Sequence, residues 1–221
     1  MSLDHIQLTP ALIDYLAAHN RPEPDIFRRL RETMTGDPDA GMQVAPQQGQ
    51  FMALLARIAG VRRYLEIGTF IGYGTLWMAS ALPDDGRIVT CELEPRFPEI
   101  GRPFWREAGV EEKIEVRLGP AVETLDAMIA DGASGSFDMA FVDANKKPYP
   151  RYYEQALALV RQGGLVLVDN VLWSGAVIDA EDRDVSTLAI REVNRIIRDD
   201  ERVEMVMTPV GDGLTIARRR S

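Results

Sequence analysis

Short apolar runs alternate with segments of helical periodicity from Arg62 to the end of the chain. The apolar runs predict strands, and apolar positions three or four residues apart predict the helices between them. This alternation is typical of parallel βαβ units. The predicted strands are Arg62–Ile67, Arg87–Leu93, Ile114–Leu118, Phe137–Val142 and Leu165–Val168. The predicted helices are Gly74–Leu82, Pro95–Ala108, Ala121–Ile129, Tyr149–Val160 and Asp184–Arg198.

Both ends of the chain depart from this alternation. Before Arg62 the pattern predicts only helices, with a polar loop at Thr35–Gln48 between the second and the third: Leu8–Ala18, Pro24–Met34 and Gly49–Ala59. After the last helix, Val203–Val210 and Leu214–Arg218 flank a Gly-Asp-Gly turn, which predicts an antiparallel hairpin.

We therefore expect a single doubly wound α/β domain over residues 1–221, with a mostly parallel sheet. Residues 61–221 would form the cofactor-binding core and residues 1–60 a helical cap. The N-terminal helices must pack on the ligand edge of the sheet or on a partner subunit. They would be either a lid or plain helical packing.

Charge and composition narrow the classes of partner. The 221 residues carry 25 Lys and Arg against 34 Asp and Glu, a net charge of -9, which argues against a broadly basic nucleic-acid surface. Small-molecule partners are more consistent with this charge. The single cysteine, Cys91, excludes an internal disulfide, and residues 1–14 lack the pattern of a signal peptide, so a cytoplasmic protein is expected. No apolar run approaches the roughly 20 residues that cross a bilayer, so no membrane association is expected.

A glycine-rich junction follows the first predicted strand. Gly68, Gly72 and Gly74 are spaced G-x-x-x-G-x-G, whereas dinucleotide sites use G-x-G-x-x-G and P-loops end in G-K-[ST]. Glycines let a ligand approach the backbone, and the following helix start offers free N–H groups. Glu66 would repel a pyrophosphate at this point, so a cationic ligand such as S-adenosylmethionine fits better. The plainer alternative is a turn that binds nothing.

Oxygen-bearing side chains stand at the ends of several predicted strands, where ligands bind in doubly wound sheets. Glu92 lies 18 residues after Gly74, near the offset at which an acid accepts ribose hydroxyls; the alternative is a solvated acid. Asp143, Asp169 and Asn170 follow two other strands. Such hard oxygen donors suit Mg²⁺ and leave open coordination positions for a substrate. An Asp-Asn pair after a strand is also an ordinary turn signature.

Three motifs in order resemble the metal-dependent class I O-methyltransferases of the caffeoyl-CoA and catechol type. They are Glu66–Tyr73, Phe141–Lys146 and Val168–Trp173, and the resemblance runs from Met42 to the C-terminal hairpin. It implies an S-adenosylmethionine-dependent enzyme with the strand order 3-2-1-4-5-7-6. It also implies a metal, Mg²⁺ or another divalent cation such as Ca²⁺ or Mn²⁺, on Asp143, Asp169 and Asn170.

The site residues follow from the strand-end analysis and from this resemblance. The expected cofactor-binding residues are Met42, Val44, Glu66, Gly68, Thr69, Gly72, Gly74, Thr75, Glu92, Ala121 and Asp143. Lys146 matches the family's lysine and is expected to take a proton from the substrate. The expected reaction moves the sulfonium methyl in line onto one oxygen of a metal-chelated vicinal diphenol, with Trp173 and Tyr149 as possible aromatic walls.

Two positions depart from the plant enzymes. Gly74 stands where they usually carry a serine, so a hydroxyl contact to the cofactor would fall to Thr75 or to the backbone. Asn145 stands where they carry an aspartate, which removes one carboxylate from beside the metal. The segment between the second and third helices is short and poor in Arg and Lys for gripping coenzyme A. The substrate is therefore expected to be a small aromatic molecule of open class.

Three alternatives remain beside this prediction. A related enzyme could methylate a hydroxylated tRNA base, although the net charge makes nucleic acid an unfavoured partner. A nucleotide-binding oxidoreductase fits the glycine spacing less well. A non-catalytic cofactor-binding protein is disfavoured by the complete set of Asp143, Lys146, Asp169 and Asn170. We expect the protein to act as a homodimer.

Overall fold

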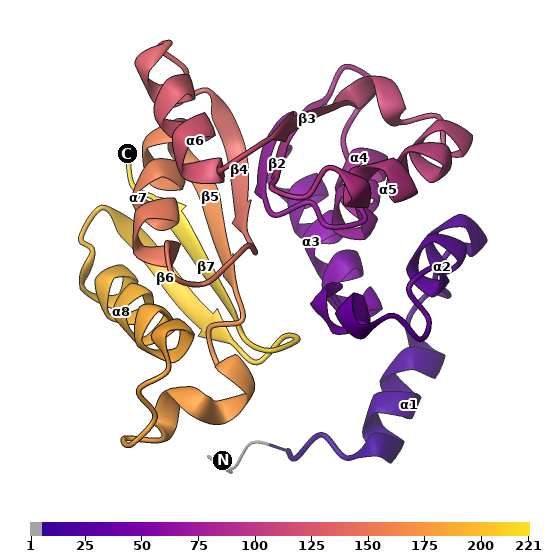
Figure 1. The fold of residues 1–221 in the computed structure, drawn as a ribbon, viewed down its shortest axis with the longest axis horizontal. Helices are drawn as coiled ribbons and strands as arrows, with labels where there is room; N and C mark the ends of the chain where they lie inside the picture. Colours follow the sequence, from indigo (N-terminus) through magenta and orange to yellow (C-terminus); the bar gives the residue numbers. More distant parts are fainter. Residues whose placement is uncertain (1–5) are drawn as a thin grey trace.

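One seven-stranded sheet organises the computed structural model, which describes residues 6–221 (Figure 1). Its order, β3-β2-β1-β4-β5-β7-β6, is the order that the resemblance implies. Strands β1 to β5 are parallel, and β7 is antiparallel to both β5 and β6. The predicted doubly wound sheet with a C-terminal hairpin is confirmed. The strands are β1 Arg63–Ile67, β2 Arg87–Glu92, β3 Ile114–Leu118, β4 Phe137–Val142, β5 Val160–Asp169, β6 Val203–Thr208 and β7 Leu214–Arg219.

Helices cover both faces of the sheet (Figure 1). Apolar residues of α6, α7 and α8 pack on one face, and those of α2, α3, α4 and α5 pack on the other. The helices are α1 Pro10–His19, α2 Asp25–Glu32, α3 Pro46–Ile58, α4 Tyr73–Ala81, α5 Arg96–Glu107, α6 Ala121–Ala130, α7 Tyr149–Leu159 and α8 Val185–Asp199. The part of the chain that the structure describes also contains short 3₁₀ helices that the periodicity did not predict: η1 Pro38–Met42, η2 Glu111–Lys113 and η3 Trp173–Ile178.

Strand β5 is longer than the apolar pattern predicts. It begins at Val160, where a helix was expected to end, because Val160 already pairs with Phe137 of β4. The pairing then shifts register before Leu165, across two glycines of which Gly163 has a φ of 75°. A glycine pair predicts a turn when seen alone, but here the neighbouring strand holds it as a bulge within the sheet.

The N-terminal helices differ in how they meet the core. Helix α3 begins at Pro46, earlier than predicted, with proline in the first turn where no N–H is needed. It packs against α4, and α2 packs against α4 and α5. Helix α1 has no buried residue and lies apart from the sheet (Figure 1). Among residues 6–221, no helix is both long and apolar enough to cross a membrane.

Candidate active site

A cavity of about 730 Å³ opens at the carboxyl ends of β1 to β5, and we call it the carboxyl-edge cavity. The loops that follow these strands supply most of its wall. The segment 41–44, at the end of η1, closes another side. Parallel strands deliver all their following loops to one edge, which is why residues far apart in sequence meet here.

The glycine junction has two separate structural roles. Gly68 has a φ of 104°, and a Cβ added there would lie 1.9 Å from the backbone oxygen of Asp143. Glycine is therefore required for the loops after β1 and β4 to touch. Gly72 has a φ of 74° and precedes α4. Its added Cβ would lie 2.1 Å from the indole of Trp105, whose Nε1 donates to the Gly72 carbonyl at 3.1 Å.

The predicted cofactor residues fall into two groups. Eight of them line the carboxyl-edge cavity: Met42, Val44, Gly68, Thr69, Gly74, Glu92, Ala121 and Asp143. Glu66, Gly72 and Thr75 do not line it. Glu66 and Thr75 are buried, and Gly72 packs against Trp105. That these three residues bind a cofactor stays a prediction. Their contacts within the protein are enough to account for a glutamate, a glycine and a threonine at these positions.

Glu66 is a buried carboxyl held by two hydroxyls. It is 1% exposed, and its Oε2 accepts hydrogen bonds from Thr75 and Thr90. Burial raises the pKa of Glu66 to about 7, although these two hydrogen bonds oppose the rise. Gly74 is adjacent to this carboxyl, since a Cβ added at Gly74 would be 3.4 Å from Oε1 of Glu66.

Glu92 lies on the cavity wall with both carboxylate oxygens fixed by backbone groups. Oε2 accepts from the N–H of Phe70 at 2.6 Å, and Oε1 accepts from Leu93 and Glu94 at 2.8 and 2.9 Å. Each oxygen has further acceptor capacity toward the cavity. The loops after β1 and β2 thus position this acid before any ligand arrives.

Two of the three metal candidates, Asp143 and Asn170, meet at Lys146. Its Nζ donates to Asp143 Oδ1 at 3.0 Å, to Asn170 Oδ1 at 2.7 Å and to the Tyr149 hydroxyl at 2.6 Å. The ammonium also lies 4.8 Å from the centroid of the Tyr149 ring and 5.7 Å from that of Trp173. Asp143, Asn170 and Lys146 line the cavity.

Asp169 is 3% exposed, and its Oδ1 accepts a hydrogen bond from the backbone N–H of Asn170 at 2.8 Å. Burial and the charge of Asp143 raise the pKa of the Asp169 carboxyl, while the polar Gln48 side chain nearby and the hydrogen bond from the Asn170 backbone N–H act against this rise. A cation bound beside Asp143 and Asp169, in addition to the Lys146 ammonium, would reduce the repulsion between the two carboxylates.

This donor set fits a hard divalent cation. Two carboxylates and one amide oxygen are the ligand types that Mg²⁺ and Ca²⁺ prefer, and a cationic nitrogen already draws two of the three to it. Within residues 6–221, no cluster of three His, Cys, Asp or Glu side chains is placed to hold a metal. The third donor here would be the amide of Asn170.

Some cavity residues were not singled out by the sequence. Phe70 and Phe97 pack against each other with ring centroids 4.4 Å apart and the rings tilted by 56°. Tyr152 donates to Oδ1 of Asn145 at 2.8 Å. The sequence could have indicated Tyr152, because it follows Tyr149 by three residues and therefore lies on the same face of the helix. The two phenylalanines meet only through the fold.

A model of the O-methyltransferase family matches residues 17–220. The chain belongs to this family. The predicted enzyme class, an S-adenosylmethionine-dependent O-methyltransferase, is thereby confirmed.

Relatives within the O-methyltransferase family are similar along most of their length. The mouse catechol O-methyltransferase domain-containing protein 1 is 41% identical over 206 residues, covering 93% of this chain and 79% of the relative. Caffeoyl-CoA O-methyltransferase 1 of Eucalyptus globulus is 40% identical over 205 residues, covering 90% of this chain and 83% of the relative. The predicted resemblance to the caffeoyl-CoA and catechol type is confirmed.

Solved structures of the family share the fold. The O-methyltransferase TomG from Streptomyces achromogenes, in complex with S-adenosylmethionine, has a TM-score of 0.85 and 35% identity, with 96% of each chain covered. An O-methyltransferase from Bacillus cereus, in complex with S-adenosylhomocysteine, has a TM-score of 0.86 and 32% identity, with 95% of this chain and 97% of that chain covered. These neighbours agree with the Rossmann-like methyltransferase fold derived above.

Proposed function

We propose that this enzyme transfers the methyl group of S-adenosylmethionine to one hydroxyl of a vicinal diphenol held by a divalent metal. The observation that carries the proposal is the convergence of Asp143, Asn170 and Lys146 on the wall of a cavity large enough for cofactor and substrate. The names of the similar catechol and caffeoyl-CoA enzymes support the acceptor class. The cofactor complexes of TomG and the Bacillus cereus enzyme support the methyl donor.

The cofactor would lie along the loops after β1, β2 and β3. Glu92 would accept hydrogen bonds from the ribose hydroxyls, since its oxygens are already oriented by three backbone N–H groups. Ala121, at the start of α6, would meet the adenine, and Met42 and Val44 would contact the methionine end. Gly68 and Gly74 have no side chain, which would let the cofactor approach the backbone closely.

Asp143, Asp169 and Asn170 would hold Mg²⁺, or Ca²⁺ or Mn²⁺. A cation bound there supplies positive charge that favours ionised phenol oxygens and offers open positions to two adjacent ones. The repulsion between half-buried Asp143 and buried Asp169 supports this role, because a bound cation would offset it.

The chain's own residues would orient the acceptor and move its proton. Lys146, in its neutral form, would take the proton of the reacting hydroxyl, and the oxygen would form the new O–CH₃ bond. Sulfur keeps the electron pair of the broken S–CH₃ bond, which leaves S-adenosylhomocysteine. Trp173, Pro148 and Tyr152 line the same cavity and would hold a flat ring there.

The deciding experiment compares a catechol with a monophenol of equal size. The catechol should be methylated, and the monophenol should react at least about 100-fold more slowly in kcat/KM, because it offers a single oxygen and loses fixed orientation. A chelator should abolish turnover, and added Mg²⁺ should restore it. Comparable rates on both phenols, or full activity in chelator, would contradict the proposal. Methylation of tRNA instead would favour the tRNA-modifying alternative, and cofactor binding without turnover on any diphenol would favour a non-catalytic cofactor-binding protein.

The quaternary state and the domain division are also proposals. Helix α1 has no buried residue, and Ile13, Tyr15 and Leu16 on it are 46–59% exposed, which supports a homodimer that covers them. We propose that residues 1–60 act as a cap on the 61–221 core, because Met42 and Val44 line the cavity. The free, buried Cys91 is consistent with a cytoplasmic location.

A further inference from the structure

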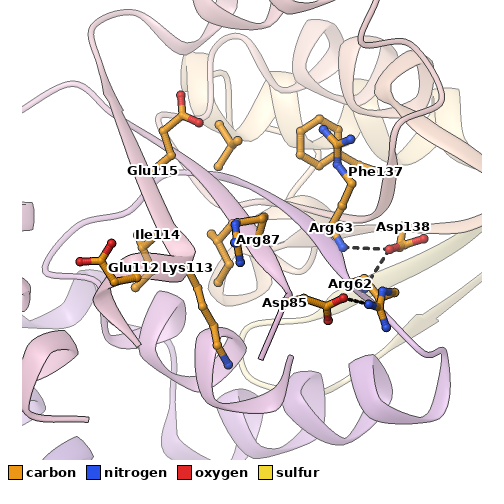
Figure 2. Close-up of a pocket in the computed structure, with 12 residues that line it drawn as sticks. Arg62, Arg63, Asp85, Arg87, Glu112, Lys113, Ile114, Glu115, Phe137 and Asp138 are labelled. Carbon is orange, nitrogen blue, oxygen red and sulfur yellow. Dashed lines mark hydrogen bonds and ion pairs between the residues drawn. The ribbon is translucent and has the colours of Figure 1, made fainter. Parts of the chain in front are cut away.

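A second cavity, of about 720 Å³, lies at the opposite edge of the sheet, at the amino ends of β1 to β4 (Figure 2). We call it the amino-edge cavity. Nothing in the proposed reaction uses it, because substrate and cofactor belong at the carboxyl ends. Its wall holds four cations, Arg62, Arg63, Arg87 and Lys113, in a protein whose net charge is -9.

Arg63 and Arg87 stand side by side in this cavity. They are the first residues of β1 and β2 and are direct partners in the parallel register. Partners in register project to the same face of a sheet. Both residues are exposed. The fold therefore places two guanidinium groups on neighbouring strands, on one face of the sheet.

Among the described residues, neither arginine is paired with a carboxylate. The Arg63 guanidinium lies 5.3 Å from the centroid of the Phe137 ring, and Arg87 Nη1 donates to the Gly86 carbonyl at 2.8 Å. Most N–H groups of both side chains remain free. In contrast, Lys113 is engaged by the carbonyls of Ala79 and Leu82 at the end of α4, at 3.2 and 3.1 Å.

Most acids of the cavity already have other cations. Asp85 pairs with Arg62, Asp138 with Arg161 at 2.7 Å, and Glu115 with Arg117 at 2.8 Å. Glu112, which is exposed, is the remaining acid of the wall. Three cations, Arg63, Arg87 and Lys113, are therefore left with one acid, Glu112. This excess of two positive charges matches the charge of a dianion.

We propose that the amino-edge cavity binds a small phosphorylated molecule through Arg63 and Arg87. Two guanidinium forks suit phosphate oxygens, and a phosphate dianion balances their charge. The volume lies within the range of small-molecule sites, about 300 to 1,000 Å³. Apolar Val89 and Phe137 beside the arginines would contact the organic part. Glu112, the remaining acid of the wall, would disfavour an extended polyanion such as RNA.

The test titrates the full-length protein, saturated with S-adenosylmethionine, with phenyl phosphate, pyrophosphate and inorganic phosphate. Binding is followed by calorimetry, and its position by amide NMR shifts. We expect one saturable site with shifts around Arg63 and Arg87, and tighter binding of phenyl phosphate than of inorganic phosphate. The variant R63Q/R87Q should bind at least about 10-fold more weakly.

The matched control is R57Q/R183Q, which removes two exposed arginines that bond only to carbonyls and line neither cavity. It should retain the wild-type affinity. If loss of the Phe137 contact unfolds R63Q/R87Q, the single variant R87Q, expected to bind several-fold more weakly, replaces it. Equal affinity of the folded variant and the wild type, or shifts confined to the loop after β1, would overturn the proposal. So would saturable binding of RNA that R63Q/R87Q weakens and phenyl phosphate does not displace.

Discussion

Single buried polar groups decide much of the behaviour of the carboxyl-edge cavity. Glu66 and Glu92 are both acids at strand ends, but they differ in burial and in the groups that donate hydrogen bonds to them. Glu66 is buried under Gly74 and receives two threonine hydroxyls, whereas Glu92 faces the cavity and receives three backbone N–H groups. The first is suited to supporting the loop, and the second is suited to meeting a ligand.

The pKa of Glu66 predicts a pH-dependent stability. It is about 7 in the folded protein against 4.5 for an ordinary glutamate. Between these values the unfolded chain gives up a proton that the folded protein keeps. Stability is therefore fully present below pH 4.5 and is lost as pH rises through 7, by roughly 3 kcal/mol in total. Glu66→Gln should flatten this loss in urea unfolding of the apo protein.

The control for Glu66→Gln is Glu181→Gln, which changes an exposed acid and should leave the pH profile as in the wild type. Wild-type and Glu66→Gln profiles that run parallel from about pH 4.5 to about pH 7.5 would show that this residue does not titrate as described.

Glu92→Ala tests the proposed ribose contact. Loss of a hydrogen bond to a charged acceptor should weaken S-adenosylmethionine binding by about 1.5 to 3 kcal/mol, measured by calorimetry on the folded variant. Glu94→Ala is the matched control, because it removes the same charge from the wall of the same cavity. An affinity equal to that of the Glu94→Ala control would mean that Glu92 serves only the loop backbone.

At the scale of elements, glycines set how closely loops and helices approach. Gly68 lets the loop after β1 touch the loop after β4, and Gly72 lets α5 place Trp105 against the start of α4. The glycine spacing predicted that both belong to a ligand-binding loop. The structure adds that Gly72 is required by packing, whatever ligand binds.

Gly72→Ala should therefore destabilise the fold by roughly 2 to 4 kcal/mol. A non-glycine residue at positive φ costs about 1 to 2 kcal/mol, and the clash with Trp105 adds a similar amount. Gly109→Ala is a control with a similar φ, 69°, and no atom within 4 Å of the added Cβ. Urea unfolding should show a loss of about 1 to 2 kcal/mol for the control. Equal losses of unfolding free energy in the two variants would show that a clash with Trp105 adds nothing to the cost of Gly72→Ala.

At the scale of the whole molecule, the sheet separates two chemistries. Its carboxyl edge gathers acids and Lys146, and its amino edge carries Arg63 and Arg87, which pair with no carboxylate within residues 6–221. Helix α1 stands outside this arrangement, with apolar side chains exposed. An exposed apolar helix face favours association with another chain.

We expect the protein to be a dimer in solution by light scattering. The double variant I13D/L16D, which places two charges on the exposed face of α1, should shift it to monomer without loss of helical signal. Arg21→Asp, which changes charge beyond the end of α1, should remain dimeric. A wild type that is monomeric at micromolar concentration, or an I13D/L16D variant that stays dimeric, would contradict the role of α1.

The sequence by itself determined the order of the main helices and strands, the place of the glycine-rich loop and the class of enzyme. These depend on local periodicity, on glycine spacing and on short motifs such as Phe141–Lys146, which are legible along the chain. It also led to the expectation that Asp143 and Asn170 share an edge, because parallel strands end together.

Only the tertiary structure decided what these residues touch. The contacts of Lys146 with Asn170, of Gly72 with Trp105 and of Glu66 with Thr90 join separate elements. The bulged start of β5 depends on β4, and the arginine pair at the amino edge depends on the register of β1 with β2. Local patterns carry no information on such pairings, because they arise from packing between segments far apart in the chain.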